Sequence, residues 1–444
     1  MEIVYPNISQ NDFDYAIECL EACKQEHAEQ YGFRHPYFTP GGQYGKQWWQ
    51  LDSALALCGY KWIDRHFAET ALLNFIESQK SDGRICLWGA DVLPNTVAGN
   101  NSLCQTKNIS SLPKLFDVSY HIVQGSNDLD LKTATYNMLK NYLNWWFINR
   151  QDEKTGLITA VFEETFIPYL GFSEEYAPVD TNVEIYVGCH YTQLLAIELG
   201  KTADAEDLEY RKHNLKQSIN QYLWNKEKGS YFAYFVKERR QSDRLMASTF
   251  YPLRMEIANF DQRKSLIKLL KNQAHFNWNA IPLTSVSMKD DAFITTKGEY
   301  QGNASWSGNV WTLINEMVIR GLIDSKENEL AAELAVKTLS AFNHNCTEFI
   351  NPFDGSGHGV IQYAWTASQY LELIIETIFG ISYQAKDQTI ILSPKLTTEL
   401  KNSYLELKDI HISNDVYLNV KIDHGNISYS ISENSIKINI EILP

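Results

Sequence analysis

The sequence predicts a mainly α-helical protein, a closed toroid of helical hairpins followed by a small antiparallel β unit. Up to about residue 378, apolar residues recur at the three-to-four spacing of amphipathic helices, and these segments alternate with loops. No strict repeat occurs, which favours a closed ring over an open solenoid. From residue 381 the pattern alternates with period two. We therefore expect a helical domain over residues 1–378 and a β unit over residues 379–444.

The helical segments follow one another in a regular rhythm. The first is predicted over residues 10–30, where Phe13, Ile17 and Leu20 share one face. A loop rich in glycine and aromatic residues then leads into a helix over residues 53–79. Pro113 lies near the first turn of another, because proline is favoured there. Further helices are predicted over residues 129–151 and 180–200, in the segment that begins at residue 203, as two helical pieces within residues 248–273, and within residues 305–322 and 363–374.

The C-terminal segments have the alternation of strands. The segments are TIILS, VYLNVKI, NISYSIS and KINIEIL, and turns are predicted at residues 423–425 and 433–435. Few polar loops lie between them, so we expect this unit to have a packing role.

Composition excludes several classes of function. The formal net charge of −15 argues against partners such as nucleic acid and anionic membrane surfaces, which attract clustered lysine and arginine. No apolar run approaches the ~18 residues of a membrane span. The N-terminus has no signal-peptide pattern and the seven cysteines have no paired spacing, so we expect a cytoplasmic protein with free thiols. No phosphate-binding loop, zinc motif or EF-hand appears, so we expect no cofactor and no metal. Nothing in the sequence indicates the oligomeric state.

Three loops combine carboxylates with turn-forming residues beside apolar helices. They are EETF at residues 163–166, EEYAPVD at 174–180 and TEFINPFD at 347–354. Aromatic residues make up 13% of the chain, and their rings either pack in the core or stack on sugar rings. Because binding and catalytic residues often lie in loops between rigid helices, the carboxylates of these loops are the main candidates for catalysis.

Seven segments, in the same order, resemble the inverting α-glycosidases of glycoside hydrolase families 63 and 37, a group that includes trehalases and mannosylglycerate or glucosylglycerate hydrolases. The segments are WWQLDS, PVDTNVEIYVG, TFYPLRMEIAN, IPLTSVSMKDDAF, SWSGNVWTLINEMVIRGL, TEFINPFDG and YAWTASQYLELI, within residues 41–375. The resemblance implies an (α/α)6 toroid, in agreement with the helical rhythm. The chain departs from the pattern at three places. The relatives' W-E-S-G-x-D reads FEETFI here, their G-P-V-W-P reads GNVWT, and PLRMEIA carries Arg254.

The resemblance implies two catalytic carboxylates, Asp180 as general acid and Glu348 as general base. Inversion requires carboxyl groups about 6.5–9.5 Å apart, with water between the base and the sugar. Asp180 must hold a proton near neutral pH, so we expect burial or the nearby acids Glu163, Glu164 and Glu184 to raise its pKa. We expect Glu348 to stay ionised.

Other loop residues are predicted to bind the sugar. They are Tyr44, Trp48, Trp49, Asp52, Glu163, Trp306, Trp311, His358 and Trp365. Asp52 is also a plausible N-cap, and Trp311 and Trp365 are also candidates for helix packing. Arg254 either meets an anionic aglycone or pairs with Glu256.

The sequence therefore predicts an inverting exo-α-glycosidase whose substrate is a small carbohydrate. We expect a short α-glucoside or α-mannoside, either a disaccharide or a glycosyl-glycerate. One alternative is a sugar isomerase or 2-epimerase on the same toroid, with His190 and His358 as acid and base. Another is a carbohydrate-binding relative that has lost activity, which the two retained carboxylates disfavour.

Overall fold

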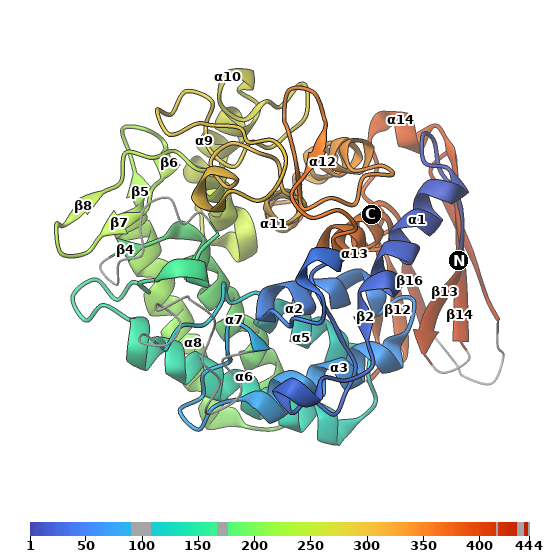
Figure 1. Ribbon diagram of the computed structural model, residues 1–444, viewed down its shortest axis with the longest axis horizontal. Coiled ribbons are helices and arrows are strands. Elements are labelled where there is room, and N and C mark those ends of the chain that lie inside the picture. Colours follow the sequence, from blue (N-terminus) through green and yellow to red (C-terminus); the bar gives the residue numbers. More distant parts are fainter. Residues whose placement is uncertain (90–107, 167–175, 414–415, 433–438, 443–444) are drawn as a thin grey trace.

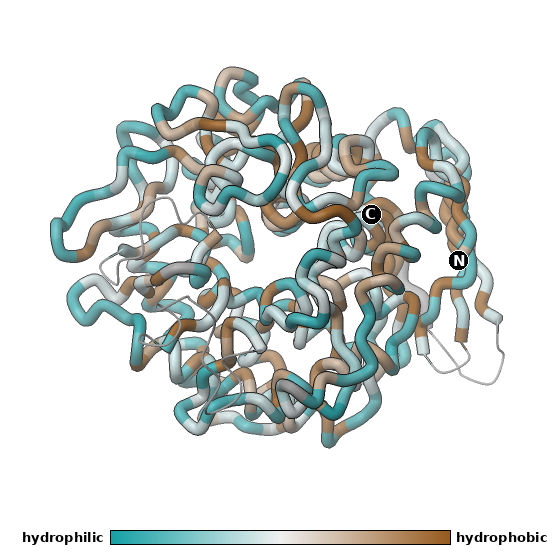
Figure 2. The backbone as a smooth tube through the Cα atoms, viewed as in Figure 1, coloured by the Kyte–Doolittle hydropathy of each residue, from teal (hydrophilic) through white to brown (hydrophobic). Residues whose placement is uncertain are grey.

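The computed structural model describes residues 1–89, 108–166, 176–413, 416–432 and 439–442. Within these ranges the protein is mainly α-helical, with a β unit at one side beside the N-terminus (Figure 1). The hydrophobic stretches of the chain lie mostly on interior helices, and the outer loops are largely hydrophilic (Figure 2). None of the described helices is both long and apolar enough to cross a membrane. The described cysteines are all free thiols.

Six helices contact one another in a closed cycle around the middle of the molecule (Figure 1). In order they are α2 (Gln50–Tyr60), α5 (Leu115–Gln124), α7 (Val179–Glu198), the short helix Ala247–Glu256, α11 (Thr312–Asp324) and α13 (Ala364–Glu372), which returns to α2. Helix α7 is buried over most of its length, including polar residues such as Asp180, Asn182 and Glu184.

A second set of helices packs outside this ring. It comprises α3 (Arg65–Ser78), α6 (Leu129–Arg150), α8 (Thr202–Ser218), α9 (Phe260–Leu270), α12 (Asn328–Ala341) and α1 (Gln10–Cys23). Each of the first five contacts the inner helix that precedes it in the chain, and α1 contacts α13. Short helices lie at α10 (Gln273–Phe276) and α14 (Thr398–Lys401). The predicted rhythm of helical hairpins is therefore present, although α1 ends at Cys23, earlier than the sequence pattern predicts.

The C-terminal segments form two small sheets. One has the order β1 (Glu2–Val4), β13 (Tyr404–Ser413), β14 (Val416–Asp423) and β15 (Asn426–Ile431), all antiparallel. The other consists of β11 (Ile381–Gln384), β12 (Thr389–Leu392) and β16 (Asn439–Ile442), in which β12 and β16 run parallel. The predicted turn at residues 423–425 joins β14 to β15, and the one at 433–435 lies outside the described residues. The strand at the N-terminus was missed, because three residues carry too little alternation to be recognised.

Short two-residue strands connect the loops. They are β2 (Lys24–Gln25), β3 (Tyr37–Phe38), β4 (Tyr176–Ala177), β5 (Trp224–Asn225), β6 (Ser230–Tyr231), β7 (Tyr234–Phe235), β8 (Arg240–Gln241), β9 (Phe349–Ile350) and β10 (Gly357–His358). The hairpin of β9 and β10 follows directly after Glu348, so it fixes the loop that carries this carboxylate.

Candidate active site

A cavity of about 90 Å³ lies where the loops before the inner helices converge. Its lining residues come mainly from the segments before α2, α5, α11 and α13 and from the turn at residues 162–164. They are Pro40, Tyr44, Trp49, Leu51, Asp52, Leu87, Ser111, Glu163, Tyr300, Trp306, Glu348, Tyr363 and Trp365. The N-terminal ends of the inner helices therefore surround the cavity, which is walled by aromatic rings and carboxylates.

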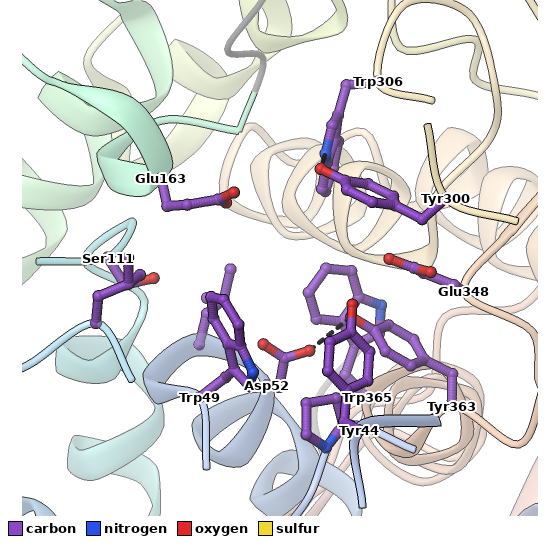
Figure 3. Close-up of a pocket in the computed structure, with 13 residues that line it drawn as sticks. Tyr44, Trp49, Asp52, Ser111, Glu163, Tyr300, Trp306, Glu348, Tyr363 and Trp365 are labelled. Carbon is purple, nitrogen blue, oxygen red and sulfur yellow. Dashed lines mark hydrogen bonds between the residues drawn. The ribbon is translucent and has the colours of Figure 1, made fainter. Parts of the chain in front are cut away.

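Three carboxyl groups face this space. Glu163 and Glu348 extend toward it from opposite sides, and Asp52 lies between them on the α2 side (Figure 3). Burial and the nearby acids raise the pKa of Glu348 to about 8, and burial and Asp52 raise that of Glu163 to about 7. Burial raises the pKa of Asp52 to about 6. The set can therefore hold both a proton and a negative charge near neutral pH, which acid–base catalysis requires.

Backbone contacts fix the carboxyl group of Glu348. The Val360 N–H donates to its Oε2 at 3.0 Å, and the Glu348 N–H donates to the Val360 carbonyl at 2.9 Å. Gly359 has a φ of +72°, and a Cβ there would lie 2.4 Å from Oε2 of Glu348. Only glycine combines this left-handed backbone with the close approach. The expectation that Glu348 is ionised differs from its raised pKa, because burial of the carboxyl group outweighs the hydrogen bond from Val360.

Asp52 lies in the first turn of α2, two residues after the helix begins. The helix starts after Trp49, so Asp52 is not its N-cap as one interpretation of the sequence proposed. Its Oδ1 accepts a hydrogen bond of 2.6 Å from the hydroxyl of Tyr363. This contact joins the first and last helices of the ring at the cavity wall and favours the ionised carboxylate.

Glu163 is presented by a short helical turn that its neighbour Glu164 anchors. The carboxylate of Glu164 is buried and accepts from the guanidinium of Arg150 at 2.7 and 2.8 Å. It also accepts from the backbone N–H groups of Ser110 and Val161 at 3.0 and 3.1 Å. Charge-assisted bidentate pairs of this kind are strong and directional. The carboxyl group of Glu163 accepts no hydrogen bond from the described residues and faces the cavity.

Asp180 does not line this cavity. It is 1% exposed and lies in the first turn of α7, where its carboxylate accepts from Thr165 Oγ1 at 2.9 Å and from Phe166 N at 2.7 Å. The N–H of Thr181 donates to it at 2.8 Å. Burial raises its pKa, as predicted, but Glu163, Glu164 and Glu184 are not among the causes. In this geometry Asp180 holds the segment that follows Glu163 and does not face the space for a sugar.

The predicted aromatic residues divide into lining and packing groups. Tyr44, Trp49, Trp306 and Trp365 line the cavity. Trp48 is fully buried, with its ring 5.2 Å from Phe33 and 5.3 Å from Phe75. Trp311 is also fully buried and stacks on Trp306 at 3.6 Å, so it supports the wall from behind. The predictions that Trp48 and Trp311 contact the sugar are not supported by these positions.

Two histidines and one arginine lie away from the cavity lining. His358 contacts Ser356 and the Gly298 N–H, at 2.8 and 3.1 Å, and His190 lies along α7 beside Tyr191. Neither is placed to act on a sugar in this cavity, so the isomerase alternative lacks its acid–base pair here. Arg254 is buried and pairs with Asp324 at 3.0 Å and Asp117 at 3.6 Å. Arg254 therefore pairs with these two acids instead of the predicted Glu256, and it is not among the residues that line the cavity.

Several residues of the cavity lining were not predicted from the sequence, namely two tyrosines, a serine, a proline and two leucines. Tyr300 accepts a hydrogen bond of 2.9 Å from Trp306 Nε1, and Tyr363 holds Asp52. Ser111 and the apolar residues Pro40, Leu51 and Leu87 complete the wall. Tyr363 is the first residue of the recognised segment YAWTAS, and Tyr300 lies five residues before the recognised segment SWSGNVW, which was the available signal. Among the described residues, no group of three or more His, Cys, Asp or Glu side chains is arranged to hold a metal.

Comparison with known proteins identifies the class of protein. Residues 45–165 and 168–366 match the family model described as the mannosylglycerate hydrolase MGH1-like glycoside hydrolase domain. These ranges contain nearly the whole cavity lining, so the protein is a glycoside hydrolase. The chain belongs to this MGH1-like family.

Individual relatives are distant. A mannosylglycerate hydrolase from Rubrobacter radiotolerans is 25% identical over 186 residues, which span 41% of this chain and 40% of that protein. The mannosylglycerate hydrolase of family 63 from Thermus thermophilus, in complex with glucose, has a TM-score of 0.68 at 19% identity, covering 81% of this chain and 99% of that chain. The neutral trehalase of Saccharomyces cerevisiae has a TM-score of 0.57 at 15% identity, over 77% of this chain and 73% of that one. The two structures show a shared fold.

Proposed function

We propose that the protein hydrolyses a short α-glucoside or α-mannoside with inversion, with Glu163 as general acid and Glu348 as general base. The observation that carries this proposal is the position of the two carboxyl groups on opposite sides of one cavity (Figure 3). An inverting enzyme needs this arrangement, because the leaving oxygen and the attacking water lie on opposite faces of the sugar.

The reaction follows from these positions. The protonated carboxyl group of Glu163 donates its proton to the glycosidic oxygen as the bond to the anomeric carbon breaks. The carboxylate of Glu348 removes a proton from a water molecule, whose oxygen attacks the anomeric carbon from the other face. The products are the free β-anomer of the sugar and the alcohol of the aglycone. A proton then passes from Glu348 to Glu163 through solvent to restore the starting state.

The two roles are assigned from different features. The segment TEFINPFDG resembles the part of the relatives that carries the base, and the Val360 N–H favours the ionised form of Glu348. Hydroxyl groups of a bound sugar would donate to the same carboxylate and lower its pKa further. Glu163 receives no such donor from the described residues, and burial raises its pKa to about 7, so it can hold a proton near neutral pH. Because the pKa of Glu348 in the structure is higher, about 8, the roles rest on the donors and the resembling segment and not on the order of the two pKa values.

Asp180 is proposed to be a positioning residue. The resemblance assigns it the role of acid, and this role stays a prediction. Its contacts with Thr165 and Phe166 favour the indirect role, because they hold the turn from which Glu163 reaches the cavity.

The cavity is suited to one neutral sugar ring. A cavity needs about 10–15 Å³ of this kind of volume to hold one water molecule. The cavity volume of 90 Å³ therefore corresponds to roughly six to nine water molecules. This is the scale of a single ring. Its described lining contains three carboxyl groups and no lysine, arginine or histidine. An anion placed there would be repelled, whereas sugar hydroxyls can donate to carboxylates. We also infer that the ring of six inner helices and its outer partners is an (α/α)6 toroid.

A panel of α-linked disaccharides, neutral α-glycosides and glycosyl-glycerates, followed by proton NMR, tests the proposal. We expect a burst of β-anomer from a neutral α-glucoside or α-mannoside. An initial α-anomer would contradict inversion. Interconversion of free sugars, or binding without turnover of any member, would contradict the hydrolase assignment for this chain.

A further inference from the structure

A second cavity lies at the opposite end of the helical ring. Its volume is about 740 Å³, and it is lined by the C-terminal half of α11, the start of α12 and the segments around β11 and β12. The active-site cavity lies near the N-terminal end of α11, so the two cavities are separated by the length of this helix. The second cavity lies between the helical ring and the C-terminal β unit, and the proposed reaction does not use it.

The lining of this cavity is cationic although the chain carries a net charge of −15. Arg320, Lys326 and Lys395 line it together with His121, and Glu376 is the acid among the lining residues. The carboxylate of Glu376 is already paired, with Lys61 at 2.5 Å and Arg320 at 3.1 Å. Arg320 also pairs with Glu316 and Glu372. Lys326 and Lys395 form no ion pair with a carboxylate within the residues that the structure describes, although Glu327 and Glu329 flank the start of α12 next to Lys326.

Lys395 is a buried ammonium group without a carboxylate partner in the described part of the chain. It is 8% exposed, and its Nζ donates to Ser393 Oγ at 2.6 Å. Backbone hydrogen bonds of 2.9 Å from Lys395 to Thr377, and from Ser393 to Gly380, fix both side chains on the cavity wall. Burial and the charge of Lys326 lower the pKa of Lys395. A buried charge of this kind is costly unless a counter-ion reaches it.

The start of α12 adds donors to the same wall. Asn328 is its first residue and lines the cavity, and the N-cap Glu327 forms no side-chain capping hydrogen bond. An uncapped helix N-terminus presents free N–H groups and the positive end of the helix dipole. The helix has 14 residues, enough for a full dipole. Anions commonly bind at such ends.

We propose that this cavity binds a small oxyanion of the phosphate class, free or as the monoester of a small molecule. Lys326 and Lys395 supply the charge, and the N-terminus of α12 supplies backbone donors. Ser393 accepts from Lys395, so its own hydroxyl hydrogen is available to the anion. The net negative charge of the chain repels anions in general, whereas the basic residues that line this cavity attract them.

Isothermal titration calorimetry tests the proposal. The full chain is titrated with inorganic phosphate in a chloride buffer of matched ionic strength. The variants are Lys326→Asn and Lys395→Gln, and the control is Lys226→Gln, which removes an exposed lysine elsewhere. Asparagine suits position 326 because its φ is +65°. Glutamine keeps a donor for Ser393.

We expect saturable binding of phosphate to the wild type and to the control, and at least a tenfold weaker affinity in each cavity variant. Absence of saturable binding to the wild type would overturn the proposal, as would equal affinity in the cavity variants and the control. If Lys395→Gln does not fold, the phosphate affinity of Lys326→Asn alone tests the proposal. The side chain of Lys326 is exposed, so its replacement should not prevent folding. A sugar phosphate titrated in the same way distinguishes an ester ligand, bound more tightly, from the free ion.

Discussion

Gly359 lies so close to Glu348 that a Cβ added to it would stand 2.4 Å from Oε2 and 2.7 Å from Cβ of the glutamate. The backbone at Gly359 also has a left-handed φ of +72°. Because the Val360 N–H that follows binds the same carboxylate, this short segment sets where the proposed base can lie. The glycine acts on the reaction through the glutamate.

Gly359→Ala should therefore lower kcat by at least tenfold, because Glu348 must move to admit the methyl group. It should also lower stability by about 1–2 kcal/mol through backbone strain. Gly200→Ala is the matched control, since Gly200 has a φ of +68° and open space at its Cβ position. It should show the strain in urea unfolding and keep its kcat. An equal loss of kcat in both variants would contradict the contact argument.

Substitution of two adjacent tryptophans should affect different properties, stability for Trp48 and substrate affinity for Trp49. Trp48 is fully buried, so Trp48→Ala should cost about 3–5 kcal/mol of stability. Trp49 lines the cavity and is only partly buried. Trp49→Ala should keep most of the stability and raise KM instead, which thermal unfolding and steady-state kinetics measure. A larger stability loss for Trp49 than for Trp48 would show that the assignment of the two rings is reversed.

Tyr363→Phe removes the hydroxyl that donates to Asp52 at 2.6 Å and leaves the ring in place. Hydrogen bonds to charged groups contribute about 1.5–3 kcal/mol. We therefore expect kcat/KM to fall by roughly ten- to a hundredfold. The acidic limb of the pH–rate profile should move to higher pH, because this bond holds the pKa of Asp52 down. Tyr429→Phe, at an exposed position in β15, serves as control. An unchanged acidic limb would mean that Asp52 takes no part in the titration.

Glu348 should make the stability of the enzyme depend on pH. Its pKa in the folded protein, about 8, lies above the ordinary value of 4.5. The native state therefore holds a proton that the unfolded chain releases. This stabilisation is fully present below about pH 4.5 and is lost as pH rises through about 8. From about pH 5 to pH 8, the wild type should lose up to a few kcal/mol relative to Glu348→Gln, since one pKa unit is ~1.4 kcal/mol.

Urea unfolding of both proteins at the two pH values measures this difference, with the exposed Glu227→Gln as control. A constant difference between wild type and Glu348→Gln would show that the pKa of Glu348 is not raised.

The sequence indicated the helical rhythm, the β alternation and the loop of Glu348, because each leaves a local pattern. It also indicated most of the cavity wall, since Tyr44, Trp49, Asp52, Glu163, Trp306 and Trp365 lie in recognised segments. The direction in which a side chain points is a tertiary property. Trp48 and Trp49 are adjacent and face opposite environments, and no local pattern separates them.

The position of Asp180 illustrates the same limit. Its motif was recognised at a helix start, where a carboxylate can either face the site or bind the neighbouring backbone. The loop of Thr165 and Phe166 decides between these outcomes by donating to it. Likewise, Arg254 is flanked by Glu256 in sequence but meets Asp324 across the fold.

The assignment of Glu163 as proton donor is the central claim, and the dependence of rate on the leaving group tests it most directly. Glu163→Gln and Asp180→Asn are compared with the wild type on an unactivated α-glycoside and on an aryl α-glycoside of the same sugar whose phenol leaves without protonation. Loss of a general acid typically costs about 100- to 10,000-fold. We predict such a loss for Glu163→Gln on the unactivated substrate and near-complete recovery on the activated one. Asp180→Asn, which acts through the turn of Glu163, should show a smaller loss on the unactivated substrate that the activated one also relieves. Recovery confined to Asp180→Asn would contradict the account and return the role of acid to Asp180.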